Sequence, residues 1–276
     1  MIKDIVVNLG LGERGSPAGD YAISVADAFD AHVVGISFLY DPIVPVSATG
    51  YIPAEVIETQ RSDNEAAAKA AVDRFAAAAS RAGVSAEQVT LSASLAGAGD
   101  TFGRIARRFD LAVVGQAEPE ANSVEEIIAE STLFESGRPV IVVPYIQKAP
   151  LKLDNVMVCW DGSRPAARAI ADAMPLLEKA GRVEVVIIAN ERGKQDEIEG
   201  ADLGQHLARH GLKVEVNRMA GGKIDVGDAL LSHVADSGAD LIVMGGYGHS
   251  RLREFVLGGV THTILRSMTA PVLMAH

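Results

Sequence analysis

A short motif occurs twice in this chain, once in each half. Asp110-Leu-Ala-Val-Val-Gly115 returns as Asp240-Leu-Ile-Val-Met-Gly245, and Arg138-Pro-Val-Ile-Val-Val143 returns as Ala270-Pro-Val-Leu-Met-Ala275. These apolar runs are short and do not alternate with polar residues, which is typical of strands buried on both faces of a parallel sheet. The repeat therefore predicts two copies of one domain, and 276 residues suffice for two domains of average size.

The first half is expected to contain five strands separated by four helices. The strands are predicted at residues 2–9, 32–40, 89–95, 110–115 and 139–144. The first helix is predicted to begin at Ser16-Pro17, because serine suits the N-cap and proline the first helical position. The other helices are predicted at 53–82, from the turn Gly97-Ala-Gly-Asp100 to about 108, and at 123–135.

The second half repeats this order. Its strands are predicted at 155–160, 183–189, 213–219, 240–244 and 271–274, and its helices at 161–180, 202–210, 225–236 and 258–266. The Gly221-Gly222 turn is interpreted as the counterpart of Gly97-Ala-Gly-Asp100. The expected fold class is therefore α/β, with two tandem open parallel five-stranded sheets covered by helices on both faces. The predicted domains are residues 1–147 and 153–276.

Composition limits the classes of function. Hydrophobic residues make up 48% of the chain but aromatic residues only 5%, so we expect aliphatic cores. A formal charge of −11 argues against binding to nucleic acid or to anionic membranes, because neutralising phosphates requires clustered Lys and Arg. With Cys159 as its single cysteine, the chain cannot form an internal disulfide. A charged N-terminus and the lack of a long apolar run complete the expectation of a cytoplasmic protein.

The carboxyl ends of the second-half strands carry the residues that favour a ligand site. Open parallel sheets bind ligands at this edge, where the strand order reverses. Residues 161–163, 189–190 and 245–259 are predicted to gather there. Free backbone N–H groups in the glycine-rich loop and at the following helix start would form a nest for an anion, to which Arg251 or Arg253 adds charge. The alternative is that these glycines only make turns.

The same residues resemble a known family. Gly245-x2-Gly248-x9-Gly258 after the strand Asp-Leu-Ile-Val-Met is similar to the glycine motif of universal stress proteins that bind ATP. Asp161-Gly-Ser and the closing Ala270-Pro-Val-Leu-Met are similar to that family as well. Because the resemblance covers both halves, it implies a tandem universal stress protein. It also implies the adenine nucleotide alpha hydrolase-like fold and pairing of domains through their fifth strands.

The resemblance implies a nucleotide site in the second half. Asp161 would lie beside the base and ribose, while Gly245, Gly248 and Gly258 would line the phosphates of ATP, with or without Mg²⁺. His249 in the glycine loop would contact the phosphate or the base, or simply be exposed. The predicted cofactor-binding residues are Asp161, Gly162, Ala189, Gly245, Gly248, His249, Arg251, Gly258 and Gly259.

Two departures from the family pattern bear on this site. Nucleotide-binding members place Ser or Thr directly after the last motif glycine, where this chain has Gly259 and carries Thr261 two residues later. In the first half, Gly115 is followed by Gln-Ala-Glu-Pro-Glu, whose carboxylates would repel phosphate, and Asn8-Leu-Gly10 carries no aspartate equivalent to Asp161. We expect the first half to lack nucleotide binding.

The other candidate residues favour structural roles. Ser163 lacks the flanking glycines of a nucleophile elbow and suits a helix N-cap. His206 and His210 have the spacing of a metal-binding pair, but no third ligand is evident, so no metal site is predicted. Cys159, within a strand, is interpreted as a core residue. We identify no catalytic residue.

Three hypotheses remain from the sequence. The first is a stress-response protein whose second half binds ATP or a related adenine nucleotide in a regulatory or protective role. The second is a dimeric scaffold for protein contacts that binds no nucleotide, which Gly259 and the first half favour. The third is a weak ATPase. The expected partners are an adenine nucleotide, the other half of the same chain and a second copy of the chain.

Overall fold

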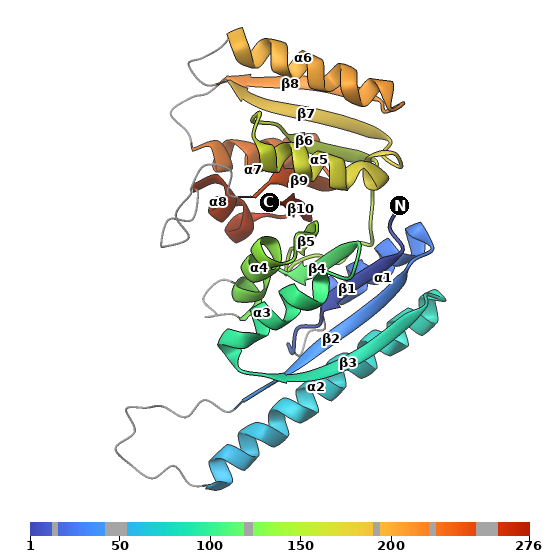
Figure 1. Ribbon diagram of the computed structural model, residues 1–276, viewed down its shortest axis with the longest axis vertical. Helices are drawn as coiled ribbons and strands as arrows, with labels where there is room; N and C mark the ends of the chain where they lie inside the picture. The colour runs from blue at the N-terminus through green and yellow to red at the C-terminus, as the bar shows by residue number, and fades with distance from the viewer. Residues whose placement is uncertain (13–15, 42–53, 119–123, 190–193, 221–224, 247–258) are drawn as a thin grey trace.

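A computed structural model describes residues 1–12, 16–41, 54–118, 124–189, 194–220, 225–246 and 259–276 (Figure 1). The elements of the first half are β1 Asp4–Asn8, α1 Pro17–Phe29, β2 His32–Tyr40, α2 Ala54–Ala82, β3 Ala86–Ala93, α3 Leu95–Ala106, β4 Leu111–Gly115, α4 Val124–Glu135 and β5 Val140–Val143. Those of the second half are β6 Asn155–Cys159, α5 Arg164–Leu177, β7 Arg182–Ala189, α6 Lys194–Arg209, β8 Val214–Ala220, α7 Val226–Ser237, β9 Leu241–Gly245, α8 Gly259–Ser267 and β10 Val272–Ala275.

All ten strands belong to one continuous sheet with the order β3-β2-β1-β4-β5-β10-β9-β6-β7-β8. Within each half the strands are parallel, and each half repeats the order third, second, first, fourth, fifth. The predicted fold class, parallel five-stranded sheets with helices on both faces, is confirmed. The two sheets meet edge to edge through their fifth strands, β5 and β10, which is the pairing that the family resemblance implies.

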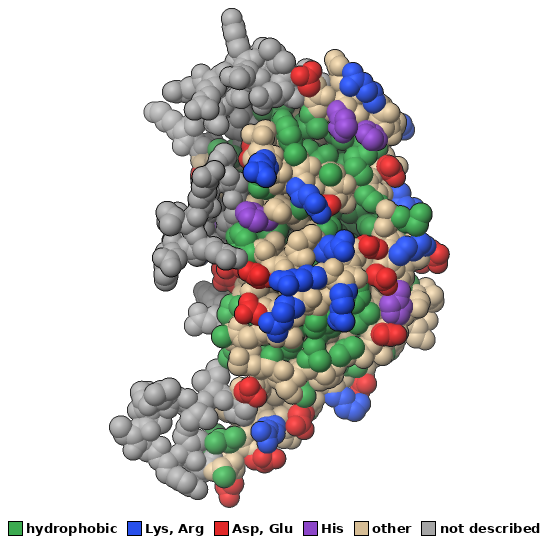
Figure 2. Space-filling model, viewed as in Figure 1, with side chains coloured by type: hydrophobic (Ala, Val, Ile, Leu, Met, Phe, Trp, Pro, Cys, Tyr) green, Lys and Arg blue, Asp and Glu red, His purple; other side chains and the backbone are tan. Residues whose placement is uncertain are grey.

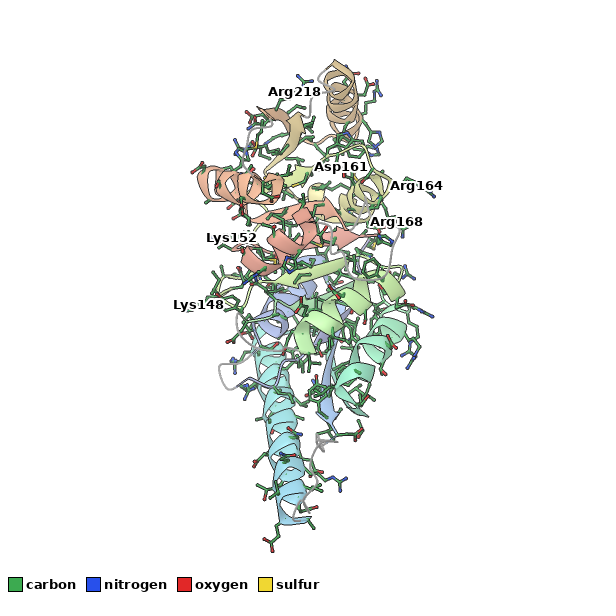
Figure 3. The ribbon with its side chains drawn as sticks, turned by 90° about the vertical axis from the view of Figure 1, so that its left-hand side faces the viewer. Lys148, Lys152, Asp161, Arg164, Arg168 and Arg218 are labelled. Atoms are coloured by element: carbon green, nitrogen blue, oxygen red, sulfur yellow. The ribbon has the colours of Figure 1, made fainter. Side chains whose placement is uncertain are left out.

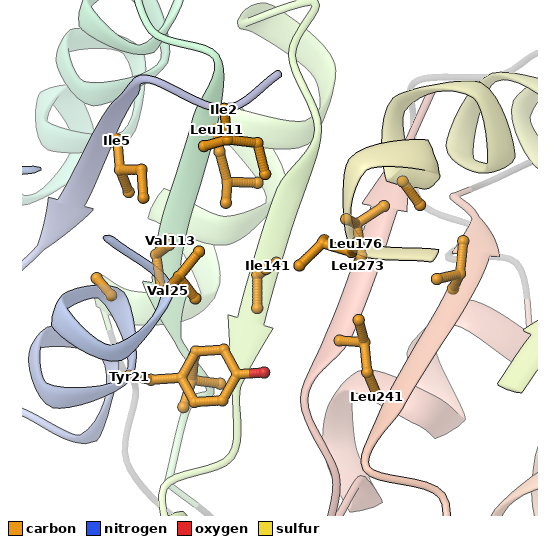
Figure 4. Close-up of a cluster of buried hydrophobic side chains, with 14 of the residues drawn as sticks. Ile2, Ile5, Tyr21, Val25, Leu111, Val113, Ile141, Leu176, Leu241 and Leu273 are labelled. Carbon is orange, nitrogen blue, oxygen red and sulfur yellow. The ribbon is translucent and has the colours of Figure 1, made fainter. Parts of the chain in front are cut away.

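The edge between the halves is an antiparallel pair. Val142 lies opposite Val272 and Ile141 lies opposite Leu273, so β5 and β10 cover each other's open edge. Figure 4 shows the side chains of Ile141 and Leu273 within a cluster of buried apolar residues that continues across this junction. Both side chains are fully buried. Burial of side chains of this size contributes about 1.5–3 kcal/mol each, so the junction stabilises both halves.

Each face of the sheet carries its own core. Side chains alternate between the faces along a strand, so Ile5 and Val7 of β1 belong to one cluster and Val6 to the other. The first cluster packs under α1, α2, α5 and α6, and the second under α3, α4, α7 and α8. Carboxyl ends of parallel strands remain between these two layers of helices, where the ligand edge is expected.

The start of α3 differs from the prediction. Ser94 caps this helix by accepting a hydrogen bond from the Gly97 amide at 3.1 Å, so the predicted turn Gly97-Ala-Gly-Asp100 lies inside the helix. The glycine is needed at Gly99, where a Cβ would lie 2.6 Å from Oγ of Ser131 in α4. Gly99 therefore serves the close packing of α3 against α4.

The predicted match to the Gly221-Gly222 turn stays a prediction. In the second half the comparable close approach lies at Gly227 of α7, where a Cβ would lie 2.7 Å from Cβ of Thr263 in α8. Residues 221–222 themselves lie outside the described residues. Helix pairs α3–α4 and α7–α8 thus use glycines at different places in the sequence to approach closely.

Two further boundaries differ for a visible reason. Strand β3 begins at Ala86 rather than at residue 89, because its first residues include exposed Glu87 and Gln88 on an edge strand, which leave no apolar signal. Helix α6 begins at Lys194 rather than at 202, ahead of its first described buried residue, Leu203. The N-cap predicted at Ser16 is confirmed, since its Oγ accepts a hydrogen bond from Gly19 at 3.2 Å.

The longest helix is α2, which Figure 1 shows extending beyond the end of the sheet. Its buried residues, Ala68, Ala71, Phe75 and Ala79, all lie in its second part. Within the described parts of the chain, no helix has the length and apolar character needed to cross a membrane.

Candidate functional site

The candidate site lies where the strand order of the second half reverses. β6 pairs with β7 on one side and with β9 on the other. The chain leaves β6 towards Asp161, leaves β7 after Ala189 and ends β9 at Gly245. All three strands run in the same direction, so these three predicted residues share one edge of the sheet (Figure 1). Such a switch point is the usual ligand position in open α/β sheets.

Asp161 lies in a tight turn that starts α5. Its Oδ1 accepts a hydrogen bond from the Ser163 amide at 2.9 Å, and Gly162 adopts a positive φ of 73°. Ser163 is the N-cap, as predicted, because its Oγ accepts from the Ala166 amide at 3.2 Å. This turn holds the exposed Asp161 at the edge of the sheet (Figure 3).

Gly245 packs directly against that turn. A Cβ at this position would lie 2.5 Å from the Ala166 amide nitrogen and 2.7 Å from the carbonyl carbon of Pro165. Both are backbone atoms, which cannot move aside cheaply, so the site requires glycine. The close contact makes the end of β9 and the first turn of α5 one structural unit.

Gly246 is a second close contact that the predicted site omits. A Cβ on Gly246 would lie 2.7 Å from Cδ2 of Leu133, a residue of α4 in the first half. Its amide donates to the Ala275 carbonyl at 2.9 Å, and its carbonyl contacts Nδ1 of His276 at 3.1 Å. The glycine pair at the end of an apolar strand is visible in the sequence, but the partner from the other half is not.

The last of the predicted site glycines that the structure describes is Gly259, the first residue of α8. It is exposed, and no atom would lie within 4 Å of a Cβ there. The first amides of a helix lack intrahelical partners and attract anions. Thr261 is buried with 5% of its surface exposed, so its hydroxyl is not at the surface where Gly259 lies. Gly248, His249, Arg251 and Gly258 lie outside the described residues, as does the side chain of Ala189.

Two basic residues on α5 lie close in sequence to Asp161. Figure 3 shows Arg164 and Arg168 extending outward from this helix. Nε of Arg168 contacts Oδ2 of Asp172 at 2.7 Å, which commits that guanidinium to an ion pair. Arg164 is exposed and follows the Asp161 turn directly. It is a cation near the edge that the predicted site does not include.

Cys159 lies at the end of β6, next to the site. It packs against the second core cluster, in agreement with its interpretation as a core residue. Burial, followed by the negative charges of Asp161 and Glu184, raises the pKa of its thiol to about 12. The thiolate form is therefore scarce at neutral pH, and a nucleophilic or redox role is disfavoured.

The equivalent edge of the first half has different chemistry. Leu9 donates to Ile36 as Trp160 donates to Val186, which makes Gly10 the counterpart of Asp161. Oε1 of Glu125 lies 3.6 Å from the position of a Cβ on Gly10. Glu125 is in the first turn of α4, so a carboxylate stands at the helix start where phosphate would be attracted.

The carboxylate of Glu125 also affects Tyr40, at the end of β2. Burial, and then the nearby carboxylate of Glu125, raises the pKa of its phenol well above the ordinary value. The first half thus presents negative charge at the place where an anion site would require positive charge. The expectation that the first half lacks nucleotide binding stays a prediction.

Of the histidine pair predicted on one helix, His206 lies in the last turn of α6 and His210 directly follows the helix, which ends at Arg209. The ring centroids of His206 and His210 lie 4.8 Å apart. Across the described residues, no group of three or more His, Cys, Asp or Glu side chains could hold a metal ion.

A polar cluster that the sequence did not suggest lies inside the second half. Glu184 occupies the middle of β7, buried to 5% exposure, and its Oε1 accepts from Nδ2 of Asn217 at 2.9 Å. Nε2 of His233 in α7 lies 2.8 Å from the same oxygen. The sequence does not predict a buried carboxylate in β7, because the other residues of this strand have the apolar pattern of a buried strand.

Comparison with known proteins identifies the second half. Residues 152–276 match the model of the universal stress protein family. A universal stress protein of Synechocystis sp. is 26% identical over 171 residues, an alignment that covers 60% of this chain and 57% of that protein. The chain therefore matches little more than half the length of this relative.

Solved structures match over the whole chain. A universal stress protein from Archaeoglobus fulgidus superposes with a TM-score of 0.71 at 17% identity and covers 99% of this chain and 97% of that one. A functionally unknown protein from Pseudomonas aeruginosa PAO1 superposes with a TM-score of 0.65 at 13% identity, covering 99% and 92% of the two chains. At these identities the likeness establishes the fold of both halves.

Proposed function

Since residues 152–276 match the model of the universal stress protein family, we propose that this half binds ATP or a related adenine nucleotide, in a regulatory or protective role. Asp161 would contact the base and ribose, and the glycine motif from Gly245 to Gly259 would hold the phosphates. The proposed role is binding rather than catalysis.

One observation carries this proposal. The turn that presents Asp161 and the glycine that ends β9 are in direct backbone contact, with the Ala166 nitrogen 2.5 Å from a Cβ on Gly245. A nucleotide needs its ribose and its phosphates held at a constant separation. The contact between Gly245 and the start of α5 supplies a rigid connection between the two parts of the proposed site.

Electrostatics support the same assignment. Helix α8 begins at Gly259, and the first amides of a helix lack intrahelical partners, which favours a negatively charged group nearby. Arg164 is exposed beside the Asp161 turn. In a chain of net charge −11, these features favour an anion at this edge of the sheet.

Calorimetric titration of the protein with ATP and Mg²⁺ tests the proposal. We expect binding by the wild type and weaker binding by Asp161→Asn, since the carboxylate would accept hydrogen bonds from ribose hydroxyls. Asp154→Asn is the matched control, because Asp154 is exposed at the opposite end of the same strand. No heat of binding at millimolar ATP would exclude the function, and equal affinities of the two variants would exclude the role of Asp161.

A second candidate is a scaffold that acts through protein contacts without nucleotide. It is favoured by Glu125 beside Gly10, because this carboxylate would repel a phosphate at the equivalent edge of the first half. Sedimentation velocity with and without ATP separates the two functions. A concentration-dependent dimer, in a protein that calorimetry shows not to bind ATP, would favour the scaffold.

Hydrolysis is the remaining alternative, and we expect none. Phosphate release from ATP should be no faster with wild-type protein than with Gly248→Val, which disrupts the glycine motif. Faster release by the wild type would show that the chain is a weak ATPase.

A further inference from the structure

The first half of the chain reaches the edge of the proposed site through the last turn of α4. Leu133 is buried to 4% exposure, and its Cδ2 lies 2.7 Å from the position of a Cβ on Gly246. The next residue, Phe134, packs edge to face against the ring of His276, with centroids 4.9 Å apart and planes at 74°. Two neighbouring residues of the first half therefore contact the ends of β9 and β10.

Residues of the second half hold Gly246 through hydrogen bonds to its N–H and its carbonyl. Gly246 donates its N–H to the Ala275 carbonyl at 2.9 Å. Its carbonyl accepts from Nδ1 of His276 at 3.1 Å, and because a carbonyl only accepts, this nitrogen carries the proton. Phe134 in turn packs on that imidazole. Gly246 is thus bonded on both sides of its backbone, with Leu133 filling the space that a side chain would occupy.

The contact is not symmetric between the halves. Gly115 and Gly245 end equivalent strands, so Gln116 occupies the position of Gly246 in the first half. Its Nε2 donates to the Leu265 carbonyl of α8 at 2.9 Å, and its Oε1 accepts from the Tyr145 amide at 3.2 Å. The Gln116 side chain of the first half thus crosses the junction to α8 of the second half. At the equivalent position of the second half, Gly246 has no side chain, which leaves room for Leu133 of α4 at the start of the glycine motif.

We propose that Leu133 and Phe134 of the first half are positioning residues for the adenine-nucleotide site of the second half, an inference that rests on the proposed function. They fix Gly246 and His276 before a ligand arrives, at the point where β9 ends and the glycine motif continues. A contact fixed in advance does not have to be ordered on binding, which raises affinity. The first half, whose equivalent edge carries Glu125, would therefore set the affinity of the second half for its nucleotide.

The test compares two variants of α4. Leu133→Ala removes the contact with Gly246, whereas Ile128→Ala removes a fully buried side chain from the same helix and the same core cluster. In titrations with ATP and Mg²⁺ we expect Leu133→Ala to bind about three- to tenfold more weakly and Ile128→Ala to bind as the wild type does. Equal affinities of the two variants would overturn the proposal. Phe134→Ala replaces Leu133→Ala if the latter does not fold, because Phe134 is partly exposed.

A second measurement needs no nucleotide. Hydrogen exchange at the Gly246 amide should be faster in Leu133→Ala than in Ile128→Ala or the wild type, since only the first variant loses the packing on Gly246. Equal exchange in all three proteins would exclude a positioning role. If the wild type binds no ATP, the proposed function fails, and faster exchange in Leu133→Ala would still support the structural part of the inference.

Discussion

The carboxylate of Glu184 and the imidazole of His233 lie 2.8 Å apart inside the second half, between β7 and α7. Burial alone would raise the pKa of Glu184. Hydrogen bonds from Asn217 and His233, with the charges of His233 and Arg182, outweigh burial and hold that pKa below its ordinary value. The ionised carboxylate is therefore part of the folded structure, and this has a measurable consequence for stability.

We expect Glu184 to make the folding free energy depend on pH in the acid range. A folded pKa below the unfolded one, which is about 4.3, means that the stabilisation is complete above that unfolded value. It is lost as pH falls through the folded pKa. Urea unfolding of wild type and Glu184→Gln between pH 7 and pH 3 measures it.

The variant should be about 1–3 kcal/mol less stable at pH 7, because it loses hydrogen bonds to a charged acceptor. The difference between the two proteins should shrink towards acid pH. Parallel stability curves over the whole range would show that Glu184 does not titrate with folding.

Gly245→Ala should damage the second half, because its new methyl group would meet the backbone of Pro165 and Ala166. We expect a loss of about 1–3 kcal/mol of unfolding free energy and weaker ATP binding, since overpacking forces backbone shifts. Gly115→Ala is the matched control: it ends the equivalent strand, and no atom lies within 4 Å of its Cβ position. Similar losses in both variants would contradict the argument from close packing.

Gly259→Ser should strengthen nucleotide binding. A side chain there meets open space at the start of α8, so the serine hydroxyl can be added without a clash. We expect about three- to tenfold tighter binding of ATP by calorimetry, which corresponds to the typical net contribution of one hydrogen bond. Gly259→Ala controls for the change in backbone freedom, and a serine variant that binds no better than the alanine variant would refute a phosphate contact here.

Cys159 should be unreactive in the folded protein. Its thiol pKa is raised to about 12, chiefly by burial, so little thiolate exists at pH 8. A colorimetric thiol reagent should label the native protein slowly and the urea-unfolded protein at the rate of a free cysteine. Rapid labelling of native protein, at a rate independent of unfolding, would place the thiol at the surface.

Much of the fold is predictable because its signals are local. The second strand, His32–Tyr40, and the caps at Ser16 and Ser163 follow from short runs of residues whose preferences hold in any context. Edge strand β3 is less predictable, since exposed Glu87 and Gln88 stand in positions where a central strand would be apolar. The boundaries of the two predicted domains stay a prediction.

The candidate site divides in the same way. Asp161 and Gly245 are recognisable from their positions after apolar strands, and the repeated strand order brings them to one edge. Gly246 is not recognisable, because its partner Leu133 lies in the other half of the chain. The ligand and the contacts of Gly248, His249, Arg251 and Gly258 stay predictions.

Local sequence thus accounts for the strands, the helix caps and the edge of the sheet that favours an anion. It does not account for the junction, where β5 and β10 join two sheets into one, or for the positions at which glycine is required. Apolar periods specify which face of an element is buried, but not which element covers it. Gly245 and Gly246 look alike in the sequence, yet one meets rigid backbone and the other a side chain from the opposite half, a difference that arises only when distant segments pack together.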